Sequence, residues 1–261
     1  MSDGAWVKGW LRSATFFSLF VVGITLFGLG ITLAWPVTNV AQRRRLASLW
    51  SAYSRRLLAV TCDLHERIEG MENLPPPPYV ILAKHQSAWE TVAFVSLFYP
   101  CVQVLKQSLT WIPVFGWALK ATHQIAIDRG RGVAALHRLH EQGTDQLAQH
   151  VAVLIFPEGT RSAPGTTGKY HPGGVSLALA AGAPIVPVAH NAGLFWPRRT
   201  FLKRPGTIRV TIGPPIPTEG LSRADRKALV QKVEETIESM TRTLEAIPSA
   251  GTPEGNATVG G

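Results

Sequence analysis

The chain has 261 residues, with 26 Lys and Arg against 17 Asp and Glu, so its formal net charge at pH 7 is +9. Hydrophobic residues make up 46% of the chain and charged residues 16%, compared with about 25% charged residues in an average soluble domain. This composition excludes an intrinsically disordered chain, and the length suffices for a hydrophobic core without disulfide bonds. A basic, apolar chain without a nucleic-acid-binding motif suits an anionic membrane surface or an acidic protein partner, and we expect no nucleic acid partner.

Residues 1–74 are predicted to form a membrane-associated helical region. No charged residue occurs from Ser13 to Gln42, and the apolar stretch 16–37 is long enough to cross a hydrocarbon core of about 30 Å as a helix. Three glycines and Pro36 weaken such a helix, so a segment that only dips into the bilayer is an alternative. A cleaved signal peptide fits less well, because the apolar stretch is too long and lacks a cleavage site.

Arginines follow this apolar stretch at positions 43–45 and 55–56, whereas only Lys8 and Arg12 precede it. The excess of positive charge after the stretch predicts that the rest of the chain lies on the cytoplasmic side of the membrane. Apolar residues between 46 and 57 recur at helical spacing. This pattern predicts a basic amphipathic helix that either lies in the headgroup layer or packs on the domain.

Four prolines at 75–78 mark the start of a domain in which short Val- and Ile-rich strands alternate with helical stretches. Such strands are typical of the buried, mostly parallel central sheet of an α/β fold flanked by helices. The expected strands cover 79–83, 101–105, 124–127, 151–156, 184–188 and 207–212. A last helix over 221–247 begins with Ser222 and Asp225 at capping-box spacing. We expect this domain to span 75–247 and to be followed by a disordered tail over 248–261.

A histidine and a carboxylate, His85 and Glu90, follow the first expected strand of the domain. The carboxyl ends of strands are where the sites of α/β sheets gather. A histidine there can accept a proton from a hydroxyl group, and a carboxylate can orient the imidazole and stabilise its charged form. Because residues five apart do not face each other on a helix, His85 must precede the helix that holds Glu90. A core histidine and a Ser87-x-x-Glu90 helix cap are the structural alternatives.

Residues suited to binding a phosphate follow three further strands. Glycine allows a ligand to approach the backbone closely, and a guanidinium binds phosphate through two parallel hydrogen bonds. A single cation at such a place is more often solvated surface, but the repetition on several strands favours a site. The residues are Lys106, Arg129, Glu158, Gly159, Thr160 and Arg161.

These motifs resemble those of the glycerolipid acyltransferase family, in particular its 1-acyl-sn-glycerol-3-phosphate acyltransferases. His85 to Glu90 matches the first motif, H-x-x-x-x-D, with Glu90 in place of the usual aspartate and Lys84 where asparagine is frequent. Residues 106–129 resemble the second motif, 156–162 the third and 185–188 the fourth. Four motifs in order over about 110 residues make this a specific resemblance.

The resemblance implies an α/β acyltransferase domain over 75–247 on the cytoplasmic face of a membrane, acting in phospholipid biosynthesis. It implies that His85 and Glu90 are catalytic, and that the second and third motifs bind the phosphate of the acceptor. The expected reaction transfers an acyl group from acyl-CoA or acyl carrier protein to the sn-2 hydroxyl of lysophosphatidate, and it forms phosphatidate. We expect no cofactor and no metal.

Three other functions compete with this interpretation. Another lysolipid could replace lysophosphatidate as the acceptor. A non-catalytic membrane adaptor would use the basic cluster of Arg198, Arg199, Lys203 and Arg204 to dock anionic lipid or acyl carrier protein. A serine hydrolase would use Ser176, but no strand directly precedes this residue, as a nucleophile elbow requires. Cys62 and Cys101 have no zinc-site or disulfide spacing, and we predict that both are inert.

Overall fold

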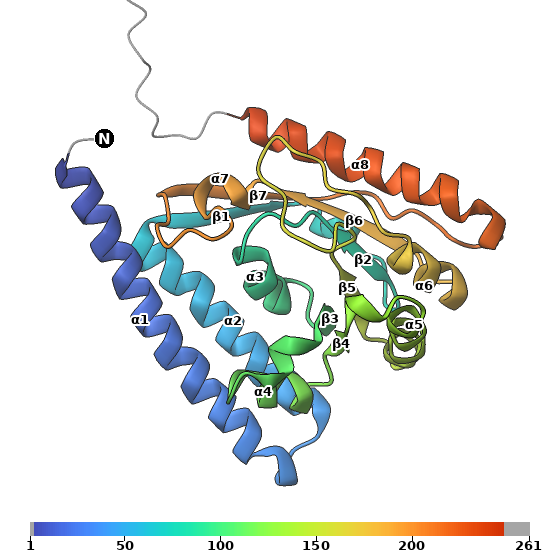
Figure 1. Cartoon of the computed structure of the whole chain (residues 1–261), viewed down its shortest axis with the longest axis horizontal. Helices are drawn as coiled ribbons and strands as arrows, with labels where there is room; N and C mark the ends of the chain where they lie inside the picture. The colour runs from blue at the N-terminus through green and yellow to red at the C-terminus, as the bar shows by residue number, and fades with distance from the viewer. Residues whose placement is uncertain (1–2, 248–261) are drawn as a thin grey trace, which may run out of the picture.

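A computed structural model describes residues 3–247, except for the side chains of residues 3–5 and of Arg129. The predicted tail over 248–261 lies outside the described residues. The centre of the molecule is a seven-stranded sheet in the order β1-β7-β6-β2-β5-β3-β4 (Figure 1). Neighbouring strands run parallel, except that β6 and β7 are antiparallel. The strands are β1 (Leu64–Glu69), β2 (Val80–Ala83), β3 (Cys101–Lys106), β4 (Ile125–Ile127), β5 (Ala152–Ile155), β6 (Ile185–His190) and β7 (Gly206–Ile212).

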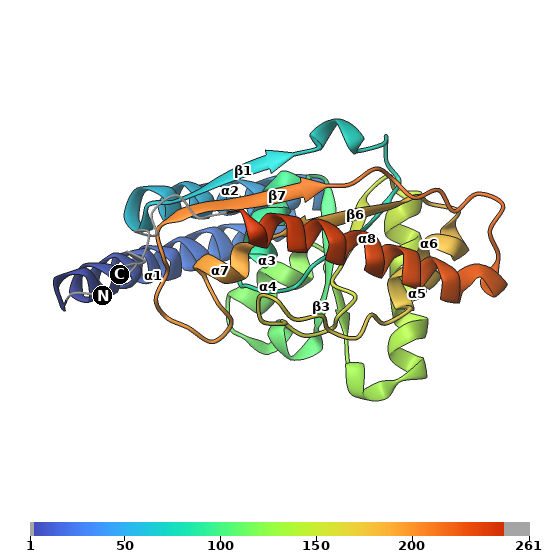
Figure 2. The same ribbon diagram turned by 90° about the horizontal axis from the view of Figure 1, so that it is seen from above.

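Helices cover both faces of this sheet (Figures 1 and 2). The helices are α1 (Asp3–Leu33), α2 (Val40–Cys62), α3 (Trp89–Leu97), α4 (Phe115–Ala121), α5 (Val133–Ala148), α6 (Gly173–Ala181), α7 (Ala192–Phe195) and α8 (Arg226–Ala246). The mostly parallel α/β architecture predicted from the sequence is thereby confirmed. The sequence also predicted the capping box of Ser222 and Asp225, which lies in the 3-10 turn Arg223–Asp225 directly before α8.

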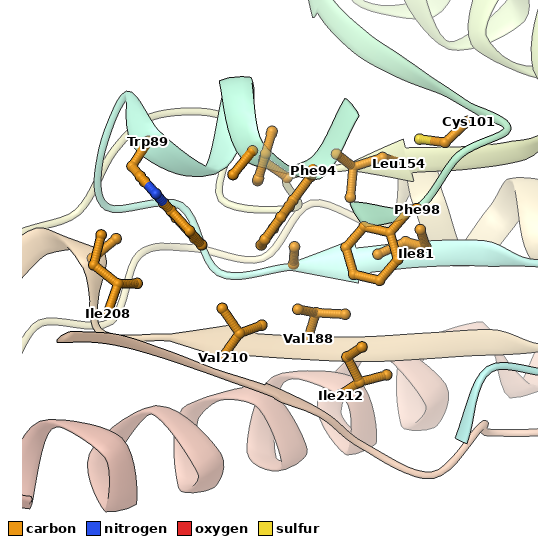
Figure 3. Packing of buried hydrophobic residues seen from close by; sticks show 14 of the residues in the cluster. Ile81, Trp89, Phe94, Phe98, Cys101, Leu154, Val188, Ile208, Val210 and Ile212 are labelled. Atoms are coloured by element: carbon orange, nitrogen blue, oxygen red, sulfur yellow. The ribbon is translucent and has the colours of Figure 1, made fainter. Parts of the chain in front are cut away.

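The central strands β2, β5 and β6 are buried on both faces, which explains their continuous apolar sequences. In β2, Ile81 and Ala83 belong to one hydrophobic cluster together with Phe94 of α3. Figure 3 shows Phe94 and Phe98 packed beside Ile81 in this cluster. Val80 and Leu82 point to the opposite face and join a second cluster with residues of α5, α6 and α8. Since full burial of such a side chain contributes about 1.5–3 kcal/mol, the two clusters fix the sheet that positions the site.

All six expected strands are present, and one further strand, β1, was not predicted. β1 runs parallel to β7, and Leu64 pairs with Gly206. Its sequence, Leu-His-Glu-Arg-Ile-Glu, is charged because β1 is an edge strand with one face open to solvent. The sheet therefore begins before residue 75, where the sequence analysis placed the start of the domain.

α1 is one continuous helix, in which residues 6–33 form a candidate membrane span with a mean hydropathy of 2.2. The glycines do not interrupt this helix, and two of them are packing positions. A Cβ atom at Gly23 would lie 2.6 Å from the Tyr53 ring of α2, and one at Gly28 would lie 2.7 Å from Val114, just before α4. Glycine therefore lets α1 pack closely against its neighbours, while most of its outward face is apolar and exposed.

α2 packs on the domain, and two of its arginines are structural. Arg43 and Arg44 are buried. The Nε atom of Arg43 donates to the carbonyl of Ala121 over 2.8 Å, and that of Arg44 donates to the carbonyl of Thr122 over 3.0 Å. Cations are favourable at the C-terminal end of a helix, here α4. Of the two alternatives for this basic helix, packing on the domain is the one observed, and these two arginines do not face the headgroup layer.

Lys203, in the segment between α7 and β7, holds α1 against the domain. Its backbone N–H donates to the Ser13 hydroxyl over 3.0 Å. Its ammonium group lies 5.0 Å from the ring centre of Phe16, 4.7 Å from that of Trp196 and 4.9 Å from that of Phe201. Burial lowers the pKa of Lys203 from 10.5 to about 8.

The depressed pKa of Lys203 predicts a pH dependence of stability. Between pH 8 and 10.5 the unfolded chain binds a proton at Lys203 that the folded chain does not, so the free energy of unfolding should rise with pH across this window. Denaturant unfolding in detergent at several pH values measures this slope. A Lys203→Met variant should lose it, and an equal slope in both proteins would contradict the assignment.

Candidate active site

His85 lies in the loop between β2 and α3, at the carboxyl end of a central strand. Its Nδ1 atom lies 2.9 Å from Oε1 of Glu90, and its ring stacks on Phe156 with a centroid distance of 4.3 Å. α3 begins at Trp89, so His85 precedes the helix that holds Glu90, as the spacing required. The side chain of His85 is 12% exposed. Since Nδ1 is engaged by Glu90, Nε2 is the ring nitrogen available to a substrate.

Glu90 is fully buried, and its Oε1 atom accepts three hydrogen bonds. The donors are Nδ1 of His85 and the backbone N–H groups of Gln86 and Ser87, at 2.9, 2.9 and 2.7 Å. Burial alone would raise the pKa of Glu90, but the nearby imidazoles of His190 and His85 and the Ser87 N–H outweigh it and lower the pKa. Glu90 is therefore ionised and fixes the orientation of His85. Glu90 thus bonds the backbone of the loop before α3 and also pairs with His85, so the structural and the catalytic-type contacts are both present.

A third residue that the sequence analysis did not single out, His190 at the end of β6, lies behind this pair. Its Nε2 atom donates to the carbonyl of Lys84 over 2.8 Å and lies 3.9 Å from Oε2 of Glu90. Its Nδ1 atom accepts from the Ala192 N–H, which fixes the tautomer. Burial lowers the pKa of His190, so this imidazole is neutral, and its Nε2–H group bonds the Lys84 carbonyl beside Glu90.

Lys84, Glu158 and Glu238 form a buried ionic network next to the catalytic loop. The Nζ atom of Lys84 is 3.2 Å from Oε2 of Glu158 and 2.7 Å from Oε1 of Glu238 on α8. The other oxygen of Glu158, Oε1, accepts the backbone N–H of His85 over 3.0 Å, and Glu238 also accepts from the Tyr170 hydroxyl. Glu158 was predicted to bind the acceptor, but both of its oxygens are engaged inside the protein. It is a positioning residue for His85.

Nothing in the sequence marks Glu238 as part of this network. It follows Ile237 in an amphipathic helix that holds three other acidic residues, Glu234, Glu235 and Glu245, and it is separated from Lys84 by most of the domain. For Lys84 the sequence gives a weak indication of burial, because this lysine directly follows a continuous apolar strand, where exposure to solvent is low.

A cavity of about 590 Å³ opens beside His85, within the usual range for a small-molecule site. Its apolar part extends between α1, α2 and α4. Four of its cationic or polar wall residues, Lys106, Thr160, Arg161 and His85, were predicted from the sequence, and so was Gly159. Arg129 begins a 3-10 turn after β4, and its side chain lies outside the described part of the chain. The cationic and the apolar residues of the wall together match an amphiphilic anion.

Two backbone details refine the expectations for residues 159–161. Gly159 adopts a φ of +68°, which glycine tolerates without strain. Its N–H donates to the Phe156 carbonyl over 3.0 Å, so it is not free to stabilise an oxyanion. The Nε atom of Arg161 is buried and has no hydrogen-bond partner among the described residues.

The alternative nucleophiles lie away from the cavity wall. Ser176 is inside α6, which follows a loop and packs in the second hydrophobic cluster. Cys62 and Cys101 are buried, and burial raises the pKa of Cys101 to about 12. A thiol with such a pKa is protonated at neutral pH, so it is a poor nucleophile.

Comparison with known proteins identifies the class. Residues 65–191 match the family model described as Acyltransferase. The chain is 41% identical over 214 residues to the 1-acyl-sn-glycerol-3-phosphate acyltransferase of Pseudomonas aeruginosa, with 80% of this chain and 82% of the relative covered. It is 32% identical over 219 residues to the human 1-acyl-sn-glycerol-3-phosphate acyltransferase alpha, with 81% of this chain and 76% of the relative covered.

The fold agrees with a crystal structure of the 1-acyl-sn-glycerophosphate acyltransferase PlsC from Thermotoga maritima. The TM-score is 0.76 at 22% sequence identity, with 92% of this chain and 97% of the other covered. The protein is thus an acyltransferase with an α/β fold. More narrowly, the chain belongs to the 1-acyl-sn-glycerol-3-phosphate acyltransferase family, as its motifs indicated.

Proposed function

We propose that the protein transfers an acyl group from acyl-CoA or acyl carrier protein to the sn-2 hydroxyl of 1-acyl-sn-glycerol 3-phosphate, and that it forms phosphatidate. The observation that carries this proposal is the His85–Glu90 pair, whose histidine lines a cavity walled by both cationic and apolar residues. Lysophosphatidate has the same division, with a phosphate headgroup next to the reacting hydroxyl and an acyl chain beyond it. The names of the relatives support the same acceptor.

In this mechanism His85 is the general base. Its Nε2 atom accepts the proton of the sn-2 hydroxyl while the hydroxyl oxygen attacks the carbonyl carbon of the acyl thioester. The tetrahedral intermediate then expels the thiolate, which receives the proton from the imidazolium. Glu90 stabilises the imidazolium between these two steps. A base positioned in this way contributes about 10²- to 10⁴-fold to the rate, and the chemistry requires neither a metal nor a cofactor.

The acceptor phosphate is assigned to Lys106 and Arg161, whose side chains line the cavity together with His85. Fixing the phosphate also fixes the hydroxyl relative to the base, so these residues affect the rate as well as the affinity. Arg129 is assigned to the same phosphate, because it follows the carboxyl end of β4. A non-catalytic adaptor would have no use for a buried, ionised carboxylate aligned with a histidine.

The proposed location is the cytoplasmic face of a membrane. The long apolar helix α1 supports membrane attachment, and several of its residues, among them Phe20, Phe27 and Ile31, also line the apolar part of the cavity. A phospholipid surface is thus a partner of the protein, and the acyl chain of a substrate would lie against the same helix that contacts lipid.

The test is acyl transfer by the full chain in detergent, with labelled acyl-CoA and labelled acyl carrier protein as donors. Lysophosphatidate is compared with lysophosphatidylcholine, lysophosphatidylethanolamine and lysophosphatidylglycerol as acceptors. We expect labelled phosphatidate as the main product, and the faster donor identifies the acyl source. Transfer to another lysolipid without transfer to lysophosphatidate would overturn the assigned acceptor, and no transfer to any acceptor would overturn the function.

A further inference from the structure

Two arginines outside the predicted site, Arg198 and Arg199, line the cavity beside His85. Both lie in the segment between α7 and β7, where the sequence indicated only a basic surface cluster. Among the described residues, the cavity wall contains Lys106, Arg161, Arg198 and Arg199 but no aspartate or glutamate. In addition to Lys106 and Arg161, which are assigned to the acceptor phosphate, the cavity wall therefore holds two further positive charges.

Hydrogen bonds place Arg198 next to the catalytic loop. Its Nη1 atom donates to the carbonyl of Arg161 over 2.5 Å. The N–H of the same peptide group, from Ser162, donates to the carbonyl of His85 over 2.9 Å. The loop is also tied to this segment by the Ser87 hydroxyl, which donates to the Trp196 carbonyl over 2.7 Å. One peptide group thus separates the guanidinium of Arg198 from the backbone of the general base.

This proximity favours the acceptor over the donor as the ligand of Arg198. In lysophosphatidate only two carbons and one oxygen separate the phosphorus from the sn-2 oxygen, a distance of roughly 5 Å at ordinary bond lengths. In acyl-CoA or acyl carrier protein the nearest phosphate follows the whole pantetheine arm. A cation one peptide away from His85 is thus within reach of the acceptor phosphate when the hydroxyl is at the base.

The headgroup charge sets the specificity. A phosphomonoester has up to two negative charges and three terminal oxygens, whereas a phosphodiester headgroup has one charge and two terminal oxygens. Arg161 lines the cavity, and its buried Nε atom has no partner in the described part of the protein. One guanidinium can satisfy a phosphodiester through two hydrogen bonds, but a second guanidinium gains its full interaction only from the extra charge and oxygen of a monoester.

We propose that Arg198 is a second arginine of the acceptor site and that it selects lysolipids with a phosphomonoester headgroup over those with a phosphodiester headgroup. This inference rests on the proposed function, because it takes a lysolipid as the acceptor and His85 as the base. It adds a specificity residue from a segment outside the four motifs.

The test compares Arg198→Gln and Arg198→Lys with the wild-type protein in detergent. Each protein is assayed with lysophosphatidate and with lysophosphatidylglycerol, and its fold is checked by thermal unfolding. Arg198→Gln should raise the KM for lysophosphatidate by about 10- to 100-fold, the range expected for the loss of charge-assisted hydrogen bonds. It should leave kcat and the donor KM within about threefold of wild type, which is the pattern of lost binding. Arg198→Lys should lie between the two.

Arg204 supplies the matched control, because it is an exposed arginine of the same segment and is not part of the cavity wall. Arg204→Gln should change neither KM. The preference for lysophosphatidate over lysophosphatidylglycerol should fall in Arg198→Gln alone. An equal loss with both acceptors would show a structural role, and a rise in the donor KM alone would assign Arg198 to the donor; either result overturns the inference. A wild-type protein inactive with every lysolipid would instead overturn the proposed function.

Discussion

Replacement of His85 by alanine should lower kcat for acyl transfer by about 10²- to 10⁴-fold, the contribution of a positioned general base. His85 is the residue whose imidazole is oriented by Glu90 and borders the cavity. The acceptor KM should remain within about threefold of wild type, because Lys106 and Arg161 still bind the phosphate. Steady-state kinetics with a labelled acyl donor measure both quantities.

His171→Ala is the matched control for this variant. His171 is exposed and lies in the loop between β5 and α6, and its backbone N–H rather than its ring bonds the Pro157 carbonyl. We expect wild-type kcat from His171→Ala. A folded His85→Ala protein with wild-type kcat would show that another group is the base.

Lys84→Met should lower the free energy of unfolding by about 3–5 kcal/mol, the cost of leaving buried charges without their partner. Methionine fills a similar volume, but Glu158 and Glu238 would then face each other without the ammonium group between them. Because Glu158 also binds the His85 N–H, kcat should fall together with stability. Denaturant unfolding in detergent gives the stability change.

Lys232 on the exposed side of α8 provides the comparison. Lys232→Met should change the free energy of unfolding by no more than about 0.5 kcal/mol, as is usual for a surface substitution. The double variant Lys84→Met/Glu238→Gln should recover part of the loss, since one unpaired charge is removed. A Lys84→Met protein as stable as wild type would contradict the stabilising role assigned to Lys84.

The extent to which the fold was predictable follows from where the hydrophobic residues are. The strands β2 and β5 are buried on both faces, so their continuous apolar sequences identified them. β1 was not predicted, because its charged residues lack the apolar pattern of a buried strand. Such residues suit an edge strand, and only the pairing with β7 holds β1 in the sheet. The burial of Arg43 and Arg44 was not predictable, since nothing local in the sequence shows that these arginines bond the carbonyls at the end of α4.

The site residues, too, were predictable where a local motif specifies them and unpredictable where tertiary contacts do. His85 and Glu90 are five residues apart, so a local motif specifies their pairing, and Lys106 and Arg161 follow recognisable strands. His190, Glu238 and Arg198 come from distant segments that the sheet order brings to the catalytic loop. Their roles depend on tertiary contacts that a single sequence does not record. Glu158 was found by its motif, but its contacts with Lys84 and the His85 N–H required the structure.

The pairing of β1 with β7 has a consequence for how the chain folds during its synthesis on the ribosome. β1 directly follows α2, yet its partner is made only after roughly 140 more residues, which takes on the order of ten seconds at typical elongation rates. Throughout that interval α1 lacks its contacts with Lys203 and Trp196. The hairpin of α1 and α2 therefore meets the bilayer, or a chaperone, before the sheet closes. Until β7 pairs with β1, the apolar face of α1 must be covered by something other than the rest of the domain.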